Sequence, residues 1–496
     1  MFQGSASSVG KSLVCAGVCR ILADMGYRVA PFKAQNMSLN SCPTENGEEI
    51  SRAQWLQAKA CRLVPDVRMN PVLLKPLGER GSEVIVMGES LGVMSYREYI
   101  DKKAGIWKTV IDAYRDLSRD MDYIALEGAG SPAEINLRKH DMANMGIARA
   151  TGANVILIAD IDKGGAFAAL AGTMALLSRG DRAMIKGFIL NKFRGDPALL
   201  QDALSWMGRR YKRPFLGIVP LLAGLKLPEE DSVAFKEKSL APSGYYMEDG
   251  KTLDIAVPDF PSISNFTDLD PFMAESDVRI RILRDAGDFG RPDLVILPGS
   301  RNAGRDASFL RDTGLGRKIK EYAMGIAESA RGALAGICGG MQIMGRVIED
   351  PDGEETRGEL AALDILPLAT AMGRDKIVRT RRARFRADGL ENYVHGYEIH
   401  RGRTRQLGNA TVCVLGEDGE ELGYADSRCP VGIWGTYLHG IFEDDLFRRD
   451  FLNTLRERKG LPRGDATVYD PDRQLDLLAK TLKNSIDITR LLAMGK

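Results

Sequence analysis

A glycine-rich loop near the start of the chain constrains the fold more than any other feature. Its sequence is Gly4-Ser5-Ala6-Ser7-Ser8-Val9-Gly10-Lys11-Ser12, one residue longer than the commoner G-x4-G-K-[ST] phosphate-binding loop. Such a loop works between a β-strand and an α-helix, and residues 13–25 have apolar side chains at the helical spacing that this requires. We therefore predict an α/β domain whose loop amides surround a phosphate. The loop residues predicted to bind ATP are Gly4, Ser8, Gly10, Lys11 and Ser12.

The strand that should feed this loop has little room. Only Met1, Phe2 and Gln3 precede Gly4. We expect either a first strand of about three residues at most, or a chain that begins late relative to its relatives. A flexible Gly/Ser-rich terminus is the alternative interpretation, and the helical pattern after the loop argues against it.

Polar residues follow several apolar runs in the first half of the chain. The predicted strands cover residues 28–32, 123–127, 154–159 and 187–191, and they alternate with helical segments as in a doubly wound parallel sheet. The carboxyl ends of parallel strands meet at one edge of a sheet, so Glu127, Asp160 and Asn191 are expected at a common edge. We predict that Glu127 and Ser12 bind Mg²⁺, and that Asn191 and Lys33 contact ATP.

A second chemical feature lies in the other half, in Ala335-Gly336-Ile337-Cys338-Gly339-Gly340-Met341-Gln342. Small apolar residues lead into the cysteine and glycines follow it, a pattern typical of a nucleophile on a tight strand-to-helix turn. The glycines relieve backbone strain and leave N–H groups nearby to bind an oxyanion. A free cysteine is often simply a buried small hydrophobe, so this pattern does not establish catalysis by itself.

A histidine partner decides between these roles, and the chain has four: His140, His395, His400 and His439. His439 is the best candidate, because it ends an apolar strand-like run about a hundred residues beyond Cys338. A cysteine nucleophile needs a base that holds the thiolate and then protonates the leaving amine. Together, Cys-Gly-Gly-x-Gln and Tyr-Leu-His-Gly-Ile-Phe resemble the glutaminase half of class I glutamine amidotransferases.

The chain departs from the commoner class I pattern, in which a glutamate stands two residues after the histidine. Ile441 occupies that position, so any third member of the site must come from elsewhere. Glu398 is a candidate orienting residue for His439, and a structural salt bridge is its alternative role.

A pocket for glutamine is expected around the cysteine turn. Leu297-Pro298-Gly299-Ser300 ends the strand before the cysteine strand, where a loop can complete an oxyanion pocket. Gln342 would lie one turn into the nucleophile's helix, near the bound glutamine. The residues predicted to bind the oxyanion or glutamine are Gly299, Ser300, Gly339 and Gln342.

Length and composition fit two catalytic halves. The chain has 496 residues, 44% of them hydrophobic and 27% charged, which suits a globular protein of two or three domains. Its net charge of +1 gives no general attraction to nucleic acid or membrane. The seven cysteines show no metal-type spacing and fit a reducing compartment. Since no apolar stretch approaches the ~20 residues of a membrane span and no signal peptide is recognisable, we expect a cytoplasmic protein.

We predict an α/β protein with two doubly wound domains. A stretch rich in glycine, proline and serine suggests the boundary between them. The tail is charged and helical in pattern, and we assign it no chemistry. The predicted parts are a synthetase domain at 1–240, a linker at 241–251, a glutaminase domain at 252–447 and a C-terminal helical tail at 448–496.

Segments along nearly the whole chain resemble the cobyric acid synthase family. They include Phe32-Lys33-Ala34-Gln35-Asn36-Met37 and residues 52–54, 70–76, 136–138, 141–146, 158–162, 227–232 and 264–268. The resemblance implies a synthetase half related to dethiobiotin synthetase, joined to a class I-like glutaminase half. It also implies a substrate, adenosylated cobyrinic acid a,c-diamide, that is amidated at its b, d, e and g side chains on the way to vitamin B12.

The resemblance also implies how the halves cooperate. ATP and Mg²⁺ would convert a carboxylate into an acyl phosphate, and ammonia from glutamine would displace the phosphate. The corrinoid is then a substrate, and no tightly bound organic cofactor is expected. The partners are small molecules, and the sequence leaves the oligomeric state open. Substrate contacts are expected at Lys75, Arg138, Lys139 and Asp160, with Lys33 also near the phosphates, although a solvated basic surface is as good an interpretation for each lysine and arginine.

Three alternatives share parts of this pattern. The enzyme that amidates the a and c groups has the same architecture, and the segment from Phe32 to Met37 argues against it. A related peptidoglycan amidotransferase usually divides the two halves between separate chains. A partitioning-type ATPase usually carries a lysine near the first glycine of its loop, where this chain has Gln3 and Ser5.

Overall fold

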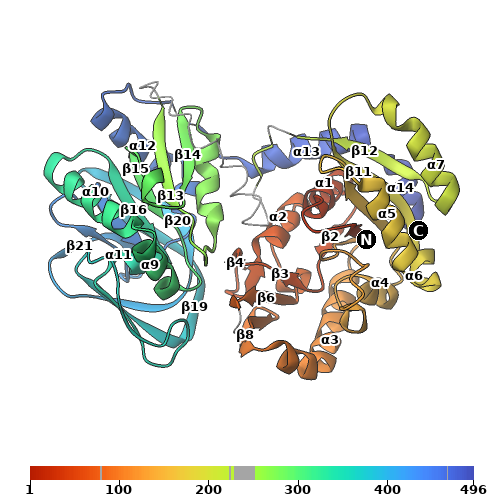
Figure 1. Cartoon of the computed structure of the whole chain (residues 1–496), viewed down its shortest axis with the longest axis horizontal. Helices are drawn as coiled ribbons and strands as arrows, with labels where there is room; N and C mark the ends of the chain where they lie inside the picture. The colour runs from red at the N-terminus through yellow and green to blue at the C-terminus, as the bar shows by residue number, and fades with distance from the viewer. Residues whose placement is uncertain (79–80, 223–224, 228–251, 466, 496) are drawn as a thin grey trace. The chain divides into compact units, whose positions relative to one another are not determined.

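The computed structural model describes residues 1–78, 81–222, 225–227, 252–465 and 467–495, and these form two compact units (Figure 1). The first unit comprises Met1–Ser38, Glu48–Glu230 and Asp470–Lys496. The second comprises Leu39–Gly47 and Asp231–Tyr469. The predicted linker, residues 241–251, lies outside the described residues.

Parallel strands form the centre of the first unit. The four-stranded sheet has the order β1 (Phe2–Gly4), β10 (Val155–Asp160), β11 (Ile185–Phe193) and β12 (Phe215–Pro220). The pair β2 (Val29–Phe32) and β9 (Tyr123–Leu126) is also parallel, and a parallel bridge joins Phe2 to Glu127 at the end of β9. The prediction of a very short first strand is confirmed, since β1 has three residues.

Helices cover both faces of this sheet. Ile156 and Ile158 of β10 pack into the apolar cluster that contains α1 (Lys11–Asp24). Leu157 and Ala159 belong to a separate cluster with α5 (Ala166–Leu176), because successive side chains of a strand point to opposite faces. The doubly wound arrangement predicted for this half is therefore confirmed. The other helices before residue 222 are α2 (Arg52–Ala60), α3 (Tyr96–Ser118), α4 (Met145–Thr151), α6 (Arg179–Met184) and α7 (Gln201–Tyr211).

A small separate sheet in this unit was not predicted. Its strands are β3 (Asn36–Met37), β6 (Val72–Pro76), β7 (Ser82–Val86) and β8 (Glu89–Met94). They lie between the loop region and α3 in the sequence. Another short strand, β5 (Glu49–Ser51), leads directly into α2.

The predicted tail at 448–496 is wrong as a single element, because its two parts belong to different units. The helix α13 (Pro471–Ser485) buries one apolar face, including Leu478 and Leu482, in the same cluster as α1 (Figure 1). A Cβ atom on Gly17 of α1 would come within 2.3 Å of Leu482, so the glycine permits this close approach. After it, α14 (Ile488–Gly495) continues in the first unit.

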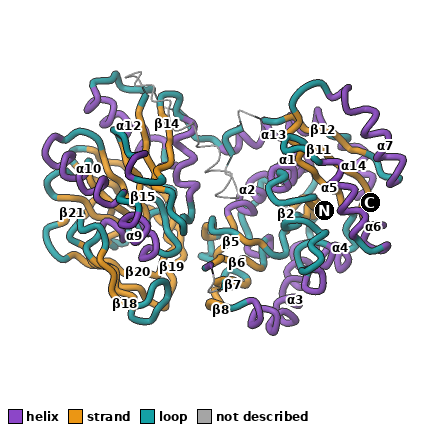
Figure 2. Tube along the Cα trace, in the orientation of Figure 1, coloured by secondary structure: helices purple, strands orange, loops and turns teal. Residues whose placement is uncertain are grey.

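The second unit is built on one large mixed sheet, visible among its helices in Figure 2. Its parallel part has the order β14 (Val278–Leu283), β13 (Leu253–Pro258), β15 (Leu294–Leu297), β16 (Ala333–Ile337) and β23 (Ile433–Thr436). An extension that was not predicted adds β22 (Glu421–Asp426), β21 (Ala410–Gly416), β19 (Leu368–Ala387), β20 (Leu390–Gln406), β17 (Val347–Asp350) and β18 (Gly358–Ala361). The helices are α9 (Ala303–Asp312), α10 (Leu315–Ser329), α11 (Gly339–Met344) and α12 (Asp445–Lys459).

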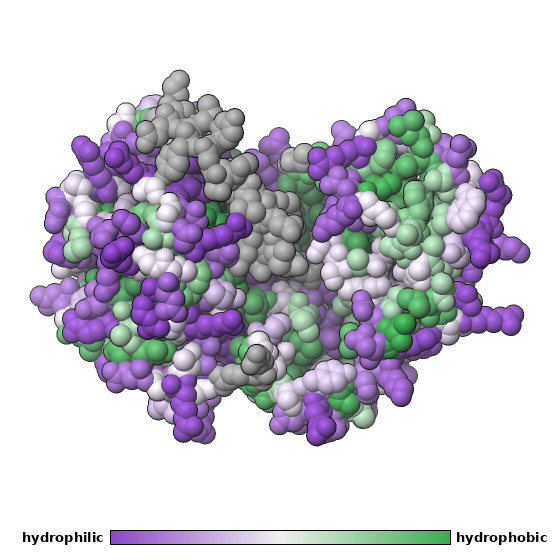
Figure 3. All heavy atoms as spheres, in the orientation of Figure 1, coloured by the Kyte–Doolittle hydropathy of each residue, from purple (hydrophilic) through white to green (hydrophobic). Residues whose placement is uncertain are grey.

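Both units have the surface of ordinary globular domains. Hydrophilic side chains cover most of the visible face of the second unit, while hydrophobic ones reach the surface of the first in several places (Figure 3). Scattered exposed apolar residues such as Leu199 are normal on protein surfaces. None of the helices in the described part of the chain combines the length and the apolar character needed to cross a bilayer.

Candidate functional site

The glycine-rich loop of the first unit lies between β1 and α1, as the motif requires. Gly10 has a φ of 91°, and a Cβ atom there would come within 2.1 Å of Nδ2 of Asn191. The amide of Asn191 donates to the carbonyl of Val9 (2.8 Å), and the amine of Lys11 donates to the carbonyl of Ala6 (3.3 Å). Asn191, predicted as an ATP contact, therefore supports the loop from β11, the second strand along from β1 in the sheet.

Glu127 is fully buried at the centre of this site. One carboxylate oxygen accepts hydrogen bonds from Oγ of Ser12 (2.8 Å) and Nζ of Lys33 (2.9 Å). The other accepts from Nε2 of Gln57 (2.5 Å), which also donates to the carbonyl of Ser12 (3.3 Å). Glu127 and Lys33 come together because they directly follow the paired strands β9 and β2. Gln57, on α2, was missed by the sequence analysis, since nothing in its local pattern distinguishes it from another polar helix residue.

These residues fit a magnesium ion held together with a nucleotide. No group of three or more His, Cys, Asp or Glu in the described ranges is arranged to hold a metal by itself. Magnesium with a nucleotide needs fewer protein ligands, because phosphate oxygens and water supply the rest. The oxygens of Ser12 and Glu127 are 2.8 Å apart, close enough for both to bind one ion, and the ammonium of Lys33 already shows that Glu127 accepts a cation there.

The four residues predicted to contact substrate differ in their burial and in their ion-pair partners. Asp160 pairs with Lys192 (2.9 Å), which also donates to the carbonyl of Ser8 in the loop (2.8 Å). Lys75 forms a buried ion pair with Glu49, which argues against the solvated basic surface considered as its alternative role. The remaining two, Arg138 and Lys139, are exposed, and Arg138 lies 3.5 Å from Asp181.

In the second unit, Cys338 sits on the turn between β16 and α11. Its φ of 51° and ψ of −106° are unusual for a residue with a side chain, as expected for a strained turn that presents a nucleophile. The two residues after it must be glycines, because neighbouring atoms leave no room for a side chain at either position. A Cβ atom on Gly340 would overlap the carbonyl of Leu297 at 1.9 Å, and one on Gly339 would lie 2.7 Å from the amide nitrogen of Ser300.

His439 is buried beside this turn, close enough to Cys338 for the two groups to interact electrostatically. Its Nδ1 donates to Oδ2 of Asp268 (2.7 Å), and the other carboxylate oxygen accepts from the amide of Gly440 (2.8 Å). Burial alone would lower the pKa of His439, but the negative charges of Asp268 and then of Cys338 outweigh it and raise the pKa to about 10. The site can therefore hold an imidazolium next to a thiolate.

The expected orienting role of Glu398 is wrong, because Asp268 holds His439 instead. The carboxylate of Glu398 bonds to His400 (3.0 Å) and Arg379 (2.8 Å), which is closer to the structural salt bridge considered as the alternative. Asp268 lies 171 residues before His439 in the chain, so no spacing could connect them. The only signal was its place in residues 264–268, one of the segments that carries the family resemblance.

The remaining predicted residues lie around the cysteine turn. A Cβ atom on Gly299 would come within 3.0 Å of Cε1 of His439, which places this glycine against the imidazole. Oγ of Ser300 donates to Asp306 of α9 (2.5 Å), and Ser300 N lies close to Gly339 as described above. Gln342, whose amide donates to the carbonyl of Cys338 (3.1 Å), also donates from its side chain to the hydroxyl of Tyr437 (3.4 Å).

Two family models match the two halves. Residues 1–234 match the CobQ/CobB/MinD/ParA nucleotide binding domain. Residues 254–447 match the CobB/CobQ-like glutamine amidotransferase domain. The matched ranges contain the glycine-rich loop and the cysteine–histidine site respectively.

Relatives along the whole chain agree with these domains. A cobyric acid synthase of Nitratidesulfovibrio vulgaris is 45% identical, over 98% of this chain and 95% of the relative. One of Clostridium botulinum is 43% identical over 99% and 98%, and one of Desulfitobacterium hafniense is 42% identical over 100% and 97%. The chain therefore belongs to the cobyric acid synthase family, glutamine-hydrolysing ligases of cobalamin biosynthesis.

Proposed function

We propose that this enzyme converts the b, d, e and g carboxylates of adenosylcobyrinic acid a,c-diamide into amides, with ATP as the energy source and glutamine as the nitrogen donor. The observation that carries the proposal is the presence of two complementary sites in one chain. One is a phosphate loop with a buried carboxylate, and the other is a cysteine beside a histidine that is hydrogen-bonded to an aspartate. The relatives' name supplies the corrin substrate class.

In the glutaminase half, the thiolate of Cys338 attacks the side-chain amide carbon of glutamine. The oxyanion that forms is bound by backbone amides of the turn at Gly339 and of the neighbouring loop at Ser300. His439 gives its proton to the nitrogen, which leaves as ammonia when the carbon–nitrogen bond breaks. Water then hydrolyses the thioester to glutamate and restores the thiol. Asp268 keeps the imidazole in the orientation and tautomer that this sequence needs.

In the synthetase half, a carboxylate oxygen of the corrinoid attacks the γ-phosphate of ATP and forms an acyl phosphate and ADP. Lys11 and the loop amides stabilise the charge that develops on the phosphate. Magnesium, when bound by Ser12 and Glu127 with the nucleotide, supplies further neutralisation of that charge. Ammonia then attacks the acyl carbon, phosphate leaves, and the amide remains. Lys33, which pairs with Glu127 at this site, supplies a second positive charge that can stabilise the negative charge on the transferred phosphate.

These proposals place the enzyme in the cytoplasm, where ATP and glutamine are available, with small molecules as its substrates. The test is to incubate the purified enzyme with adenosylcobyrinic acid a,c-diamide and to count the amide groups added to it by mass spectrometry. With MgATP and glutamine, we expect four successive amidations of the a,c-diamide, and none without ATP. Amidation of cobyrinic acid itself, with the a,c-diamide left unchanged, would instead support the alternative function in a,c-diamide synthesis.

A further inference from the structure

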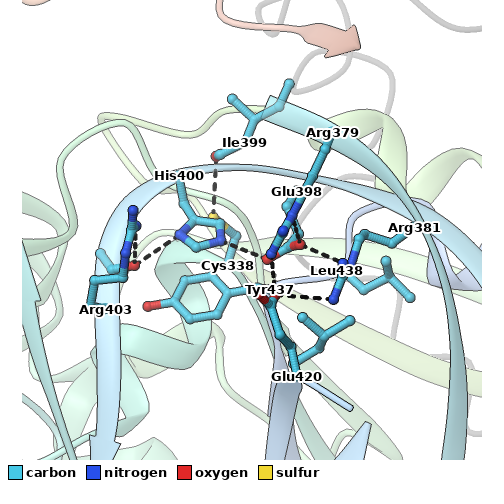
Figure 4. A network of polar contacts seen from close by, with 12 residues as sticks. Cys338, Arg379, Arg381, Glu398, Ile399, His400, Arg403, Glu420, Tyr437 and Leu438 are labelled. Carbon is cyan, nitrogen blue, oxygen red and sulfur yellow. Dashed lines mark hydrogen bonds and ion pairs between the residues drawn. The ribbon is translucent and has the colours of Figure 1, made fainter. Parts of the chain in front are cut away.

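One segment of β20 contacts the glutaminase site at several points. The ring of Tyr397 stacks on His439 (5.3 Å between centroids, 20° between planes), and the two backbones exchange hydrogen bonds of 3.0 and 2.9 Å. Two residues later, the carbonyl of Ile399 accepts a hydrogen bond from Sγ of Cys338 (3.7 Å) (Figure 4). Both members of the thiol–imidazole pair thus lie against the same strand.

The residues between these contacts hold the strand in place. Glu398 is 2% exposed, and its carboxylate hydrogen-bonds to Nε2 of His400 (3.0 Å) and Nε of Arg379 (2.8 Å) (Figure 4). It also forms an ion pair with Arg381 (3.1 Å), which lies with Arg379 on β19. Arg379 faces Glu398 directly in the register of the two strands. A buried carboxylate with two guanidinium partners and a contact to an imidazole is a strong anchor, because the two positive charges offset part of the cost of burying its own charge.

Proton positions on His400 follow from its neighbours. Nδ1 faces the carbonyl of Gly402 (2.9 Å), which can only accept, so Nδ1 carries a proton. Burial opposes ionisation of Glu398, but His400 and Arg379 outweigh it and lower its pKa below the ordinary value. An ionised Glu398 also only accepts, so the contact at Nε2 is favourable when that nitrogen too is protonated. Burial lowers the pKa of His400, while the charge of Glu398 opposes this change. The charge of Glu398 therefore favours a proton on Nε2, the ring nitrogen that faces it.

The other face of His400 connects to Gln342. The rings of His400 and Tyr437 stack at 3.8 Å between centroids and 16° between planes. The hydroxyl of Tyr437 contacts Nε2 of Gln342 (3.4 Å) and Oγ1 of Thr404 (2.6 Å). A Cβ atom on Gly402 would come within 2.4 Å of the Gln342 amide, so this part of the strand is shaped around that side chain.

We infer that Glu398 and His400 are positioning residues of glutamine hydrolysis, an anchored pair that holds the Tyr397–Gly402 segment and Tyr437 against Cys338, His439 and Gln342. Neither touches the reacting atoms. The pair acts indirectly. His400 fixes Tyr437 by stacking on it, and Glu398 fixes the strand whose Ile399 carbonyl contacts Cys338. This inference rests on the proposed function, in which Cys338 hydrolyses glutamine.

The test is the kinetics of glutamate release from glutamine by the full-length enzyme, in the presence of MgATP and the corrinoid substrate. Glu398→Gln keeps the shape of the side chain and removes its charge, and His400→Gln removes the imidazole. We expect each to raise KM for glutamine about tenfold, with kcat within about threefold, because hydrogen bonds to charged groups are the strong ones in such a site. Tyr437→Phe, which removes only the hydroxyl beside Gln342, should raise KM by a smaller factor.

Matched controls come from the same strand. Glu391→Gln and His395→Gln alter an exposed carboxylate that pairs with Arg384 and an exposed imidazole 3.7 Å from Asp444, and both should leave KM unchanged. A purely structural role would reduce the fraction of folded enzyme, which lowers kcat and leaves KM alone.

The outcomes separate the inference from the function on which it rests. An unchanged KM in both Glu398→Gln and His400→Gln, or a fall in kcat alone, would overturn the positioning role while wild-type hydrolysis stands. If either variant fails to fold, Tyr437→Phe decides, since an unchanged KM there breaks the connection to Gln342. A wild-type enzyme that releases no glutamate from glutamine would remove the proposed function and this inference together.

Discussion

The two candidate sites each contain a buried carboxylate, and the partners of the two carboxylates differ in kind. Glu127 accepts from a lysine, a serine hydroxyl and a glutamine amide, contributed by three segments of the first unit. Asp268 accepts from the imidazole of His439 and from the next residue's backbone amide. Lysine and serine can rearrange around an incoming cation, whereas the imidazole and the backbone amide hold a fixed direction.

This difference indicates what each carboxylate is suited to do. An ammonium that balances Glu127 can give way to a metal–nucleotide complex without leaving the carboxylate unpaired at any stage. A histidine that balances Asp268 remains in place and exchanges its proton on the other nitrogen. The same buried charge therefore supports phosphate chemistry in one unit and proton transfer in the other, and each of the following changes tests that separation.

Cys338→Ser should give the largest effect. Serine keeps the shape of the side chain, but its hydroxyl is far less ionised and less nucleophilic than a thiol. We expect glutamine-dependent amidation to fall about 10⁴-fold or more. Amidation with ammonium salt at mildly alkaline pH should persist, because the synthetase half needs only free ammonia. Glutamine-dependent activity that survives this change would show that Cys338 is not the nucleophile.

Glu127→Gln should have the next largest effect and the opposite pattern. The amide keeps the size of the side chain but removes the charge that faces Ser12 and Lys33. We expect amidation from either nitrogen source to fall about 10³-fold, as is typical when a residue that stabilises developing charge is lost. Glutamate release at Cys338 should continue. Gln57→Leu is the matched comparison, since it removes a partner of Glu127 and keeps the charge, and its loss should be smaller. Normal amidation by Glu127→Gln would contradict the magnesium assignment.

The parts of these sites that the sequence predicted are those encoded by local patterns. The turn at Cys338 and the loop that ends at Ser12 are continuous motifs, and the strand-to-helix turn expected at the cysteine is found between β16 and α11. Asp268 and Gln57 could not be found in this way, because they reach their sites from distant segments through the fold alone.

In the fold as well, elements with a clear local pattern were predicted, and features that depend on distant parts of the chain were not. Alternating βα patterns predicted the parallel sheets of both units. The strands β19 and β20 were not predicted, because both are rich in arginine and neither contains a long run of apolar residues. The amphipathic pattern of α13 predicts a helix with one buried face but does not say which unit it packs against.

Asp268→Asn should reduce glutaminase activity by a smaller factor than Cys338→Ser. The asparagine can still contact the imidazole, but it no longer balances the positive charge of His439. A thiolate is intrinsically nucleophilic, so loss of the orienting charge should cost about 10²-fold in kcat. Ammonium-dependent amidation should be unchanged. Asp270→Asn, at a nearby carboxylate without an assigned role, is the control, and an equal loss in both variants would indicate a general disturbance of this segment.

The smallest effect should appear in the pH dependence of stability. The pKa of His439 is about 10 in the folded protein, above the ordinary histidine value, because Asp268 and Cys338 favour the charged ring. The folded state therefore binds this proton more tightly than the unfolded chain. The stability that this contributes is complete below about pH 6.5 and is lost as the pH rises through about 10. Wild-type enzyme should lose about 2–4 °C more in unfolding temperature between pH 7 and pH 10 than His439→Gln, as measured by calorimetry. Equal losses in the two proteins would mean that the aspartate–histidine pair does not hold its proton as the geometry of the site requires.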